Sequence, residues 1–246
     1  MLGLFGSGEF EPWAEEVDRW LLARSPAGEG SVLILPTASA PEGDRVFERW
    51  GDMGLVHYAR IGVSAEVLPL KTKEDADRED LAERVRGASM AFFSGGNAAY
   101  LAEVLSGSRF WRALLAAMDR GMAYAGCSAG VAGLGERAPD NSTRSWVGAD
   151  SWRPGLRLFH RTLFGVHWDA LDRHVPGLRA SIVASIPPDH RLLAIDEKTA
   201  VVGDGSSWTV MGSGGAYLLE DGEWSEHRAG SSFPADLGNG SGDAAS

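Results

Sequence analysis

The stretch Met122-Ala-Tyr-Ala-Gly-Cys-Ser-Ala-Gly-Val-Ala-Gly133 places an apolar run directly before Gly-x-Ser-x-Gly and a series of small residues. The apolar run is typical of a buried strand, and the small residues can begin a helix. Such a sharp turn strains its central residue, and small residues two positions away prevent backbone clashes. Ser128 would then be exposed at the amino end of a helix, where free amides stabilise negative charge. The pattern predicts a nucleophile elbow; a glycine-rich helix start without chemistry is the alternative.

Outside this stretch, short apolar runs alternate with segments of helical length. The predicted strands are Leu2–Phe5, Val32–Leu35, Ala65–Leu68, Met90–Phe93 and Met122–Ala125. The predicted helices are Trp13–Ala23, Asp44–Tyr58, Arg78–Val85 and Arg109–Met118. Buried strands that alternate with helices favour a parallel sheet covered by helices on both faces. We therefore expect an α/β fold, a three-layer α/β/α sandwich.

The pattern changes after about Gly135. The polar segment Glu136–Pro154 is typical of a surface excursion, and Ala170–Ile186 is expected to be helical with a break at Pro176. Further strands are predicted at Leu163–Val166, Leu192–Ile195, Ala200–Val202, Ser207–Met211 and Ala216–Leu219. The last four favour an antiparallel extension at the end of the parallel sheet. Residues 1–229 are interpreted as one domain, and the Gly- and Ser-rich residues 230–246 as a flexible tail.

Composition narrows the class of protein. The chain has 246 residues, of which 44% are hydrophobic and 23% charged, as in ordinary globular proteins. Its 34 acidic residues against 23 Lys and Arg give a net charge of −11, so nucleic acid and membrane surfaces are poor partners. The single cysteine favours a reducing compartment. The apolar start has no preceding basic residue, and no apolar stretch reaches the length of a span, which favours a cytoplasmic location.

Cys127 stands beside Ser128 and is a rival nucleophile. An elbow centred on Cys127 would place Ala125 and Ala129 where the glycines should be, whereas Ser128 fits the spacing. The pattern therefore favours Ser128, and Cys127 is interpreted as a small buried residue.

A second glycine cluster, Ser94-Gly95-Gly96-Asn97, follows the predicted strand Met90–Phe93. In a parallel sheet this loop and the Ser128 loop emerge at the same edge. The amides of Gly95 or Gly96 could therefore form an oxyanion hole with the amide of Ala129. A tight turn with Asn97 as the helix N-cap is the alternative, and both interpretations can hold together.

Four motifs together resemble peptidase family S51, which contains aspartyl dipeptidase (peptidase E) and cyanophycinase. They are Gly6-Ser7-Gly8-Glu9-Phe10, Ile34-Leu35-Pro36-Thr37-Ala38-Ser39, Phe93-Ser94-Gly95-Gly96-Asn97 and the Gly126–Gly130 elbow. The resemblance runs from the first strand to about Leu219. It implies the class I glutamine amidotransferase-like fold, with serine in place of the catalytic cysteine.

The resemblance also implies a catalytic triad. Val166-His167-Trp168-Asp169 stands where the family has its histidine, and Ile195-Asp196-Glu197-Lys198-Thr199-Ala200 matches the family's acidic strand. By that analogy Ser128 is the nucleophile, His167 the general base and then acid, and Glu197 the carboxylate that orients the imidazole. Asp196 is the near rival of Glu197 and Asp169 a distant one. Neighbouring strand residues face opposite ways, so only one of Asp196 and Glu197 can point at the site.

The other histidines are weaker candidates for the general base. His57, His160, His174 and His190 are expected on the surface, because they occur in a helical segment or in polar surroundings. His167 alone ends an apolar strand downstream of the elbow.

The predicted substrate-binding residues are Asn97, Trp168, Arg173 and Arg179. Relatives that act on aspartyl substrates carry polar residues after Gly-Gly-Asn and several arginines after the histidine. Here Ala98 and Ala99 follow Asn97, and the segment after His167 has only Arg173 and Arg179, with Asp169 and Asp172 between. Either arginine could hold an acidic side chain by a bidentate contact, or be an exposed helix residue. Trp168 replaces the usual phenylalanine and is expected to narrow the pocket.

Three functions fit these observations. The leading hypothesis is a serine hydrolase, independent of cofactor and metal, that cuts an amide bond of a small peptide through an acyl-enzyme. An α/β-hydrolase esterase would need its histidine after its acid, at His190 or His227, and the sequence lacks a His-Gly-Gly-Gly motif. A non-catalytic binding protein on the same fold is the third. Monomer and homodimer both stay open.

Overall fold

The computed structural model describes residues 1–26, 30–142 and 151–238. Its main sheet has eight strands in the order β14-β11-β10-β1-β5-β4-β2-β3. Five of them run parallel: β1 (Leu2–Phe5), β5 (Ala123–Cys127), β4 (Met90–Phe93), β2 (Val32–Leu35) and β3 (Ala65–Val67). Three continue the sheet antiparallel beyond β1: β10 (Thr199–Gly203), β11 (Ser207–Gly212) and β14 (Ser232–Pro234).

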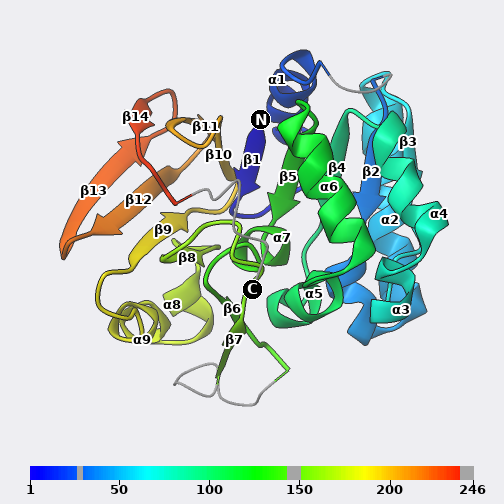
Figure 1. The fold of residues 1–246 in the computed structure, drawn as a ribbon. Coiled ribbons are helices and arrows are strands. Elements are labelled where there is room, and N and C mark those ends of the chain that lie inside the picture. The colour runs from blue at the N-terminus through cyan, green and yellow to red at the C-terminus, as the bar shows by residue number, and fades with distance from the viewer. Residues whose placement is uncertain (27–29, 143–150, 239–246) are drawn as a thin grey trace.

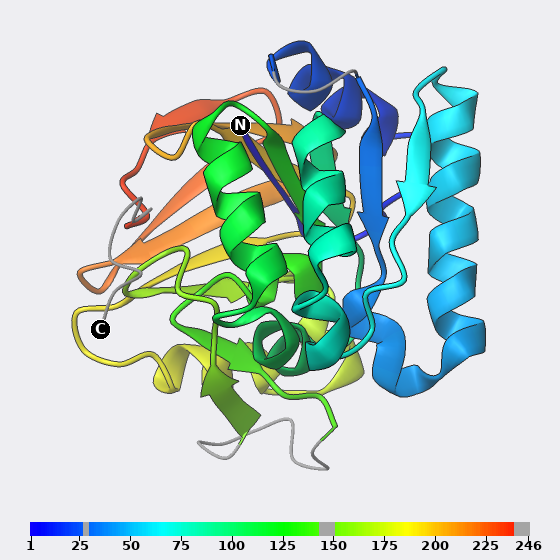
Figure 2. The ribbon, with the colours of Figure 1, turned by 45° about the vertical axis from the view of Figure 1, so that its right-hand side comes forward.

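Alternate residues of the parallel strands enter two separate cores. Phe93 and Leu35 face one core, and their neighbours Phe92 and Ile34 face the other. The first core is covered by α3 (Lys73–Ala76), α4 (Glu79–Arg84), α5 (Ala98–Leu105) and α6 (Arg109–Asp119). The second is covered by α1 (Ala14–Ala23) and α2 (Asp44–Arg60). The predicted three-layer α/β/α sandwich is therefore confirmed (Figures 1 and 2).

Local capping explains where several helices begin. The side chains of Asn97 and Ser108 accept hydrogen bonds from the third amide of α5 and of α6. Thr72 and Asp75 form a reciprocal capping box at the start of α3. Each side chain satisfies an amide that has no partner within its helix, which fixes the loops after the strands.

A second sheet, in the order β13-β12-β9-β8, holds the other C-terminal strands. It contains β8 (Thr162–Gly165), β9 (Arg191–Ile195), β12 (Gly215–Glu220) and β13 (Glu223–Arg228). The prediction that all late strands extend the main sheet is therefore wrong for β9 and β12. The reason is that β9 is apolar on both faces: Leu193 packs into the main core, whereas Leu192 packs into a third core. That core lies beneath α9 (Leu178–Ala184).

Two other segments differ in detail from the predicted elements. Within 136–154, β6 (Arg137–Pro139) and β7 (Trp152–Pro154) pair as a hairpin, and residues 143–150 lie outside the described residues. The predicted helix at 170–186 is divided into α8 (Leu171–His174) and α9, with Pro176 in the break.

The predicted flexible tail is wrong for residues 232–237. There β14 pairs with β11, Phe233 is buried opposite Trp208, and Leu237 is fully buried. These two apolar side chains fill the edge of the main core, which the Gly- and Ser-rich composition of the segment conceals. Residues 239–246 lie outside the described residues.

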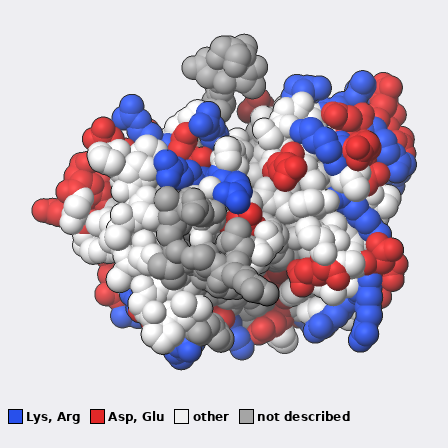
Figure 3. Space-filling view, turned by 90° about the horizontal axis from the view of Figure 1, so that it is seen from below, with Lys and Arg blue, Asp and Glu red and all other residues white. Residues whose placement is uncertain are grey.

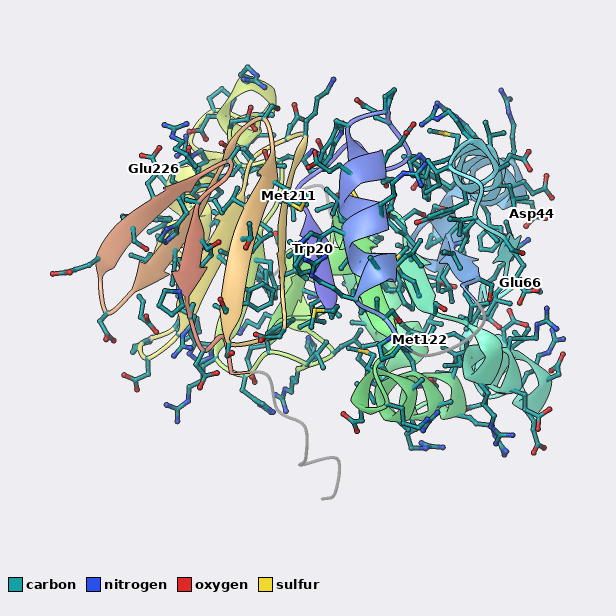
Figure 4. The ribbon with its side chains drawn as sticks, turned by 90° about the horizontal axis from the view of Figure 1, so that it is seen from above. Trp20, Asp44, Glu66, Met122, Met211 and Glu226 are labelled. Carbon is teal, nitrogen blue, oxygen red and sulfur yellow. The ribbon has the colours of Figure 1, made fainter. Side chains whose placement is uncertain are left out.

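The strands β1 and β5 point toward the lower end of the molecule, where the loops that follow them meet (Figure 1). On the face seen from that end, acidic and basic side chains are intermingled, and much of the surface is uncharged (Figure 3). At the opposite end α1 covers the junction with the antiparallel strands, where Trp20 and Met211 pack against the same core (Figure 4). In the described part of the chain, no helix has the length and apolar character needed to span a membrane.

We predict that Phe233→Ala lowers the free energy of unfolding by roughly 3–5 kcal/mol, because a buried ring leaves a cavity in the core. The measurement is urea unfolding at equilibrium. The control is Ser232→Ala at an exposed position of the same strand, with an expected change within about 0.5 kcal/mol. A Phe233→Ala effect no larger than the control would contradict the placement of β14 in the sheet.

Candidate active site

Ser128 occupies a strained turn between β5 and α7 (Ala129–Ala132), with φ +52° and ψ −105°. The two glycines of the elbow permit this turn by close backbone approach. A Cβ added at Gly126 would lie 2.4 Å from the carbonyl oxygen of Gly130. One added at Gly130 would lie 2.4 Å from the carbonyl oxygen of Phe93. Neither position accepts a side chain, so the predicted elbow has a direct steric basis.

The imidazole of His167 lies directly against the serine. Its Nε2 atom is 2.9 Å from Ser128 Oγ, and the side chain is about one-third exposed. His167 follows β8 and has φ +53°, and its amide donates to the carbonyl of Gly6 at the end of β1. The loops after β1, β5 and β8 therefore bring Ser128 and His167 into hydrogen-bond contact.

Glu197 completes the chain of contacts. Its Oε1 atom is 3.1 Å from His167 Nδ1. Its backbone amide donates to Asp169 Oδ1 at 2.8 Å, and Arg173 lies 3.6 Å from both Glu197 Oε2 and Asp169 Oδ2. A carboxylate in this place can hold the imidazole as the Nδ1–H tautomer and stabilise its cation. Asp169, the distant rival for the acid, instead supports the loop that carries Glu197.

The neighbouring acid, Asp196, faces away from the imidazole. Its Oδ2 atom accepts from the Gly215 amide at 2.9 Å and from the Tyr217 hydroxyl at 3.2 Å. Burial raises the pKa of the Asp196 carboxyl. Asp196 and Glu197 lie in the turn between β9 and β10, so the expectation that they belong to a strand is wrong, and this turn brings Glu197, and not Asp196, to His167.

The three predicted oxyanion donors have different surroundings. The Gly95 amide donates to Glu9 Oε1 at 2.9 Å, so its proton is already used. Gly96 and Ala129 line the cavity at Ser128, and among the described residues their amides have no hydrogen-bond acceptor. Of the three predicted donors, Gly96 and Ala129 therefore have amides that are free to stabilise a developing negative charge.

Cys127 is fully buried behind the serine, and its Sγ atom donates to Glu9 Oε2 at 2.8 Å. Burial raises the pKa of the Cys127 thiol well above its usual value, and the Glu9 carboxylate adds to this. A buried thiol that resists ionisation is a poor nucleophile. Glu9 is itself buried and joins the loop after β1 to β5 and to the loop after β4.

A cavity of about 280 Å³ opens at Ser128 and His167. Its walls come from α7, the β6–β7 hairpin, β8 and α9, and they are mostly apolar. Sequence reasoning did not identify the wall formed by Leu178 and Ile182. The apolar spacing of that helix was visible in the sequence, but it did not reveal which elements the helix faces.

The predicted substrate-binding residues do not gather at this cavity. Asn97 caps α5 and donates to Asp140 Oδ1 at 3.0 Å. Trp168 is 2% exposed and packs in the third core, where the guanidinium of Arg179 lies 4.7 Å from its ring. Arg173 pairs with the carboxylates beside His167. Among the described residues that line the cavity, none of these four side chains is present.

The other histidines make contacts elsewhere. His57 is not on the surface as predicted: it is buried, with Nε2 2.6 Å from Asp18 Oδ2, because α2 turns it toward α1. His190 contacts the Pro188 carbonyl, and His227 stacks on Phe233. The α/β-hydrolase arrangement is therefore not the one at Ser128, whose partner His167 precedes the acid in the chain. In the described residues, no group of three or more His, Cys, Asp or Glu side chains could hold a metal ion.

Comparisons with known proteins bear on the family and the fold. The sequence profile of peptidase family S51 matches residues 2–211. The structure is similar to that of a peptidase from an acI-B1 Actinobacterium, with a TM-score of 0.86 and 29% identity over 95% of this chain and 96% of the other. It shares its fold with a putative peptidase E protein from Listeria monocytogenes EGD-e, with a TM-score of 0.57 and 16% identity over 92% and 97%. No curated protein sequence matches.

We predict that iodoacetamide does not label Cys127 in the folded protein at neutral pH, because the thiol is buried and its pKa is raised. The same reagent should alkylate Cys127 fully once guanidinium chloride unfolds the chain. Mass spectrometry of the intact protein measures both states. Equal labelling rates in the two states would contradict the burial of the thiol.

Proposed function

This chain belongs to peptidase family S51 and is a peptidase, and we propose that it hydrolyses amide bonds of small peptides through an acyl-enzyme on Ser128. The observation that carries the proposal is the line of contacts from Ser128 Oγ to His167 Nε2 and from His167 Nδ1 to Glu197. A serine hydroxyl is a weak nucleophile until a base takes its proton, and this line provides the base.

In the acylation step, Ser128 Oγ attacks the substrate carbonyl carbon while His167 Nε2 takes the hydroxyl proton. Glu197 stabilises the imidazolium that forms and holds its Nδ1 proton. The carbonyl oxygen gains negative charge, and the amides of Gly96 and Ala129 are the donors proposed to stabilise it. The imidazolium then protonates the leaving amine, and the C–N bond breaks.

In the deacylation step, a water molecule takes the place of the leaving amine. His167 removes a proton from the water, the resulting hydroxide attacks the ester, and Ser128 regains its proton as the acid product leaves. Ser128 and His167 account for each proton that is transferred in the two steps, and the proposed steps use no cofactor. The cavity of about 280 Å³ lies just below the usual range for small-molecule pockets, which supports a substrate of a few residues.

We predict that a fluorophosphonate probe labels Ser128 in the wild-type protein and that mass spectrometry locates the adduct on that residue. Ser128→Ala should remove the label and lower kcat/KM for peptide hydrolysis by roughly 10⁴- to 10⁶-fold. His167→Ala should also prevent labelling, because the hydroxyl loses its base. Labelling that persists in His167→Ala would refute the assigned base, and turnover retained by Ser128→Ala would refute the nucleophile.

We predict that Glu197→Gln lowers kcat at least about 10²-fold, because an amide neither stabilises the imidazolium nor enforces the correct tautomer. Steady-state kinetics on the same peptide substrate measure the effect. The matched control is Asp196→Asn on the adjacent residue, which faces Gly215 and Tyr217 and should change kcat much less. The opposite ranking would assign the acid to Asp196.

A further inference from the structure

Much of the cavity at Ser128 is lined by apolar side chains, with Asn141, Ser151 and Ser181 as polar ones, and we call this mainly apolar part the chamber. Phe164 of β8 and Leu178 of α9 form two walls, and both side chains are buried. Ile182, one turn further along α9, is partly buried and lines the same space. Ala98 and Ala132 also line it, so short side chains from α5 and α7 keep the chamber open.

The charged side chains described at this chamber do not suit an acidic substrate. Among its described lining residues, the charged or titratable side chains are Asp140 and His167. The hydrogen bond from Ser142 and that from Asn97 lower the pKa of the Asp140 carboxyl, so it is ionised at neutral pH. A second carboxylate in the same cavity would meet like charge, and its desolvation would be uncompensated.

The two arginines that could have neutralised a substrate carboxylate are engaged elsewhere. Arg173 lies 3.6 Å from carboxylate oxygens of Asp169 and of Glu197. Arg179 stacks over Trp168, on the side of α9 that faces the third core. A third arginine, Arg153, lies 3.5 Å from Asp140 Oδ2 and is not among the residues that line the cavity.

The chamber adjoins α7, the helix whose first amide is proposed to bind the substrate carbonyl. Ala129 supplies one of the two free amides at Ser128, and Ala132 lies one helical turn beyond it along α7. A carbonyl bonded to Ser128 Oγ and directed at the Ala129 amide would bring the acyl part of the substrate next to α7, and Ala132 of the same helix lines the chamber. The leaving amine, in contrast, must face His167 Nε2, which protonates it.

We propose, on the basis of the serine peptidase function above, that the acyl-side residue of the substrate carries an apolar side chain of about leucine size rather than a carboxylate. The apolar walls of the chamber match such a side chain, and the removal of its surface from water contributes binding free energy. The preference of this chain thus differs from the aspartyl preference that the resemblance to aspartyl dipeptidase suggests.

The test compares the p-nitroanilides of leucine, asparagine and aspartate, which share one leaving group and have acyl side chains of similar size. Wild-type kcat/KM for the leucine compound should exceed that for the aspartate compound at least about 10²-fold, with asparagine between them. A fluorophosphonate label on Ser128 is recorded on the same preparation. Labelled enzyme that prefers aspartate, or does not discriminate, overturns the specificity and leaves the proposed function standing. Absence of both labelling and turnover overturns both.

A pair of variants on α9 localises the preference. Ile182→Arg places a cation in the chamber and should raise the aspartate-to-leucine ratio of kcat/KM at least about 10-fold. Val183→Arg is the matched control, because Val183, like Ile182, is partly buried against the third core but does not line the cavity. The ratio is independent of the fraction of folded enzyme, so partial misfolding of a variant does not obscure it. An unchanged ratio in Ile182→Arg, or an equal rise in both variants, overturns the assignment.

Discussion

The backbone turns from β5 into α7 at Ser128 with a φ of +52°, a conformation that a serine holds only when its surroundings enforce it. Strain of this kind costs on the order of 1–3 kcal/mol, and the packing of small residues around the turn offsets it. Gly126 of β5 packs closely against Gly130 of α7, and Gly130 packs closely against Phe93 of β4. These three elements therefore form one closely packed unit. The position of the hydroxyl, and therefore of everything that must contact it, follows from this unit.

A buried carboxylate reinforces the same unit. Glu9 accepts from the Gly95 amide and from the Cys127 thiol, so the loop after β1 is tied to the loop after β4 and to the elbow strand. The Gly95 amide is occupied by this contact, and the next residue, Gly96, lines the cavity. The same contact surrounds Cys127 with apolar protein and a negative charge, which suppresses its thiolate. One carboxylate thus occupies the Gly95 amide and holds Cys127 buried, while Ser128 and Gly96 line the cavity.

Local patterns predicted those features whose causes are local. The alternation of apolar runs and helices predicted the parallel sheet, and Gly126-x-Ser128-x-Gly130 predicted the elbow, because strand periodicity and steric clearance act between near neighbours. The second sheet, by contrast, depends on the two apolar faces of β9, and only the packed structure shows that each faces a different core. Spacing also left Glu197 and Asp196 equivalent, since the choice depends on Gly215 and Tyr217 capturing Asp196.

The residues that line the cavity were the part of the site that the sequence predicted least well. Arginine and tryptophan side chains can form several kinds of interaction. Here Arg173 pairs with carboxylates, and Arg179 stacks on Trp168. The chamber is instead built from residues such as Ala98 and Ile182, whose side chains carry no chemistry and whose spacing indicates only a buried helix face. The chemistry of a pocket depends on which faces of helices and strands, far apart in the sequence, pack together around it. Reaction class can therefore be inferred from a short motif, whereas substrate class requires the packed cavity.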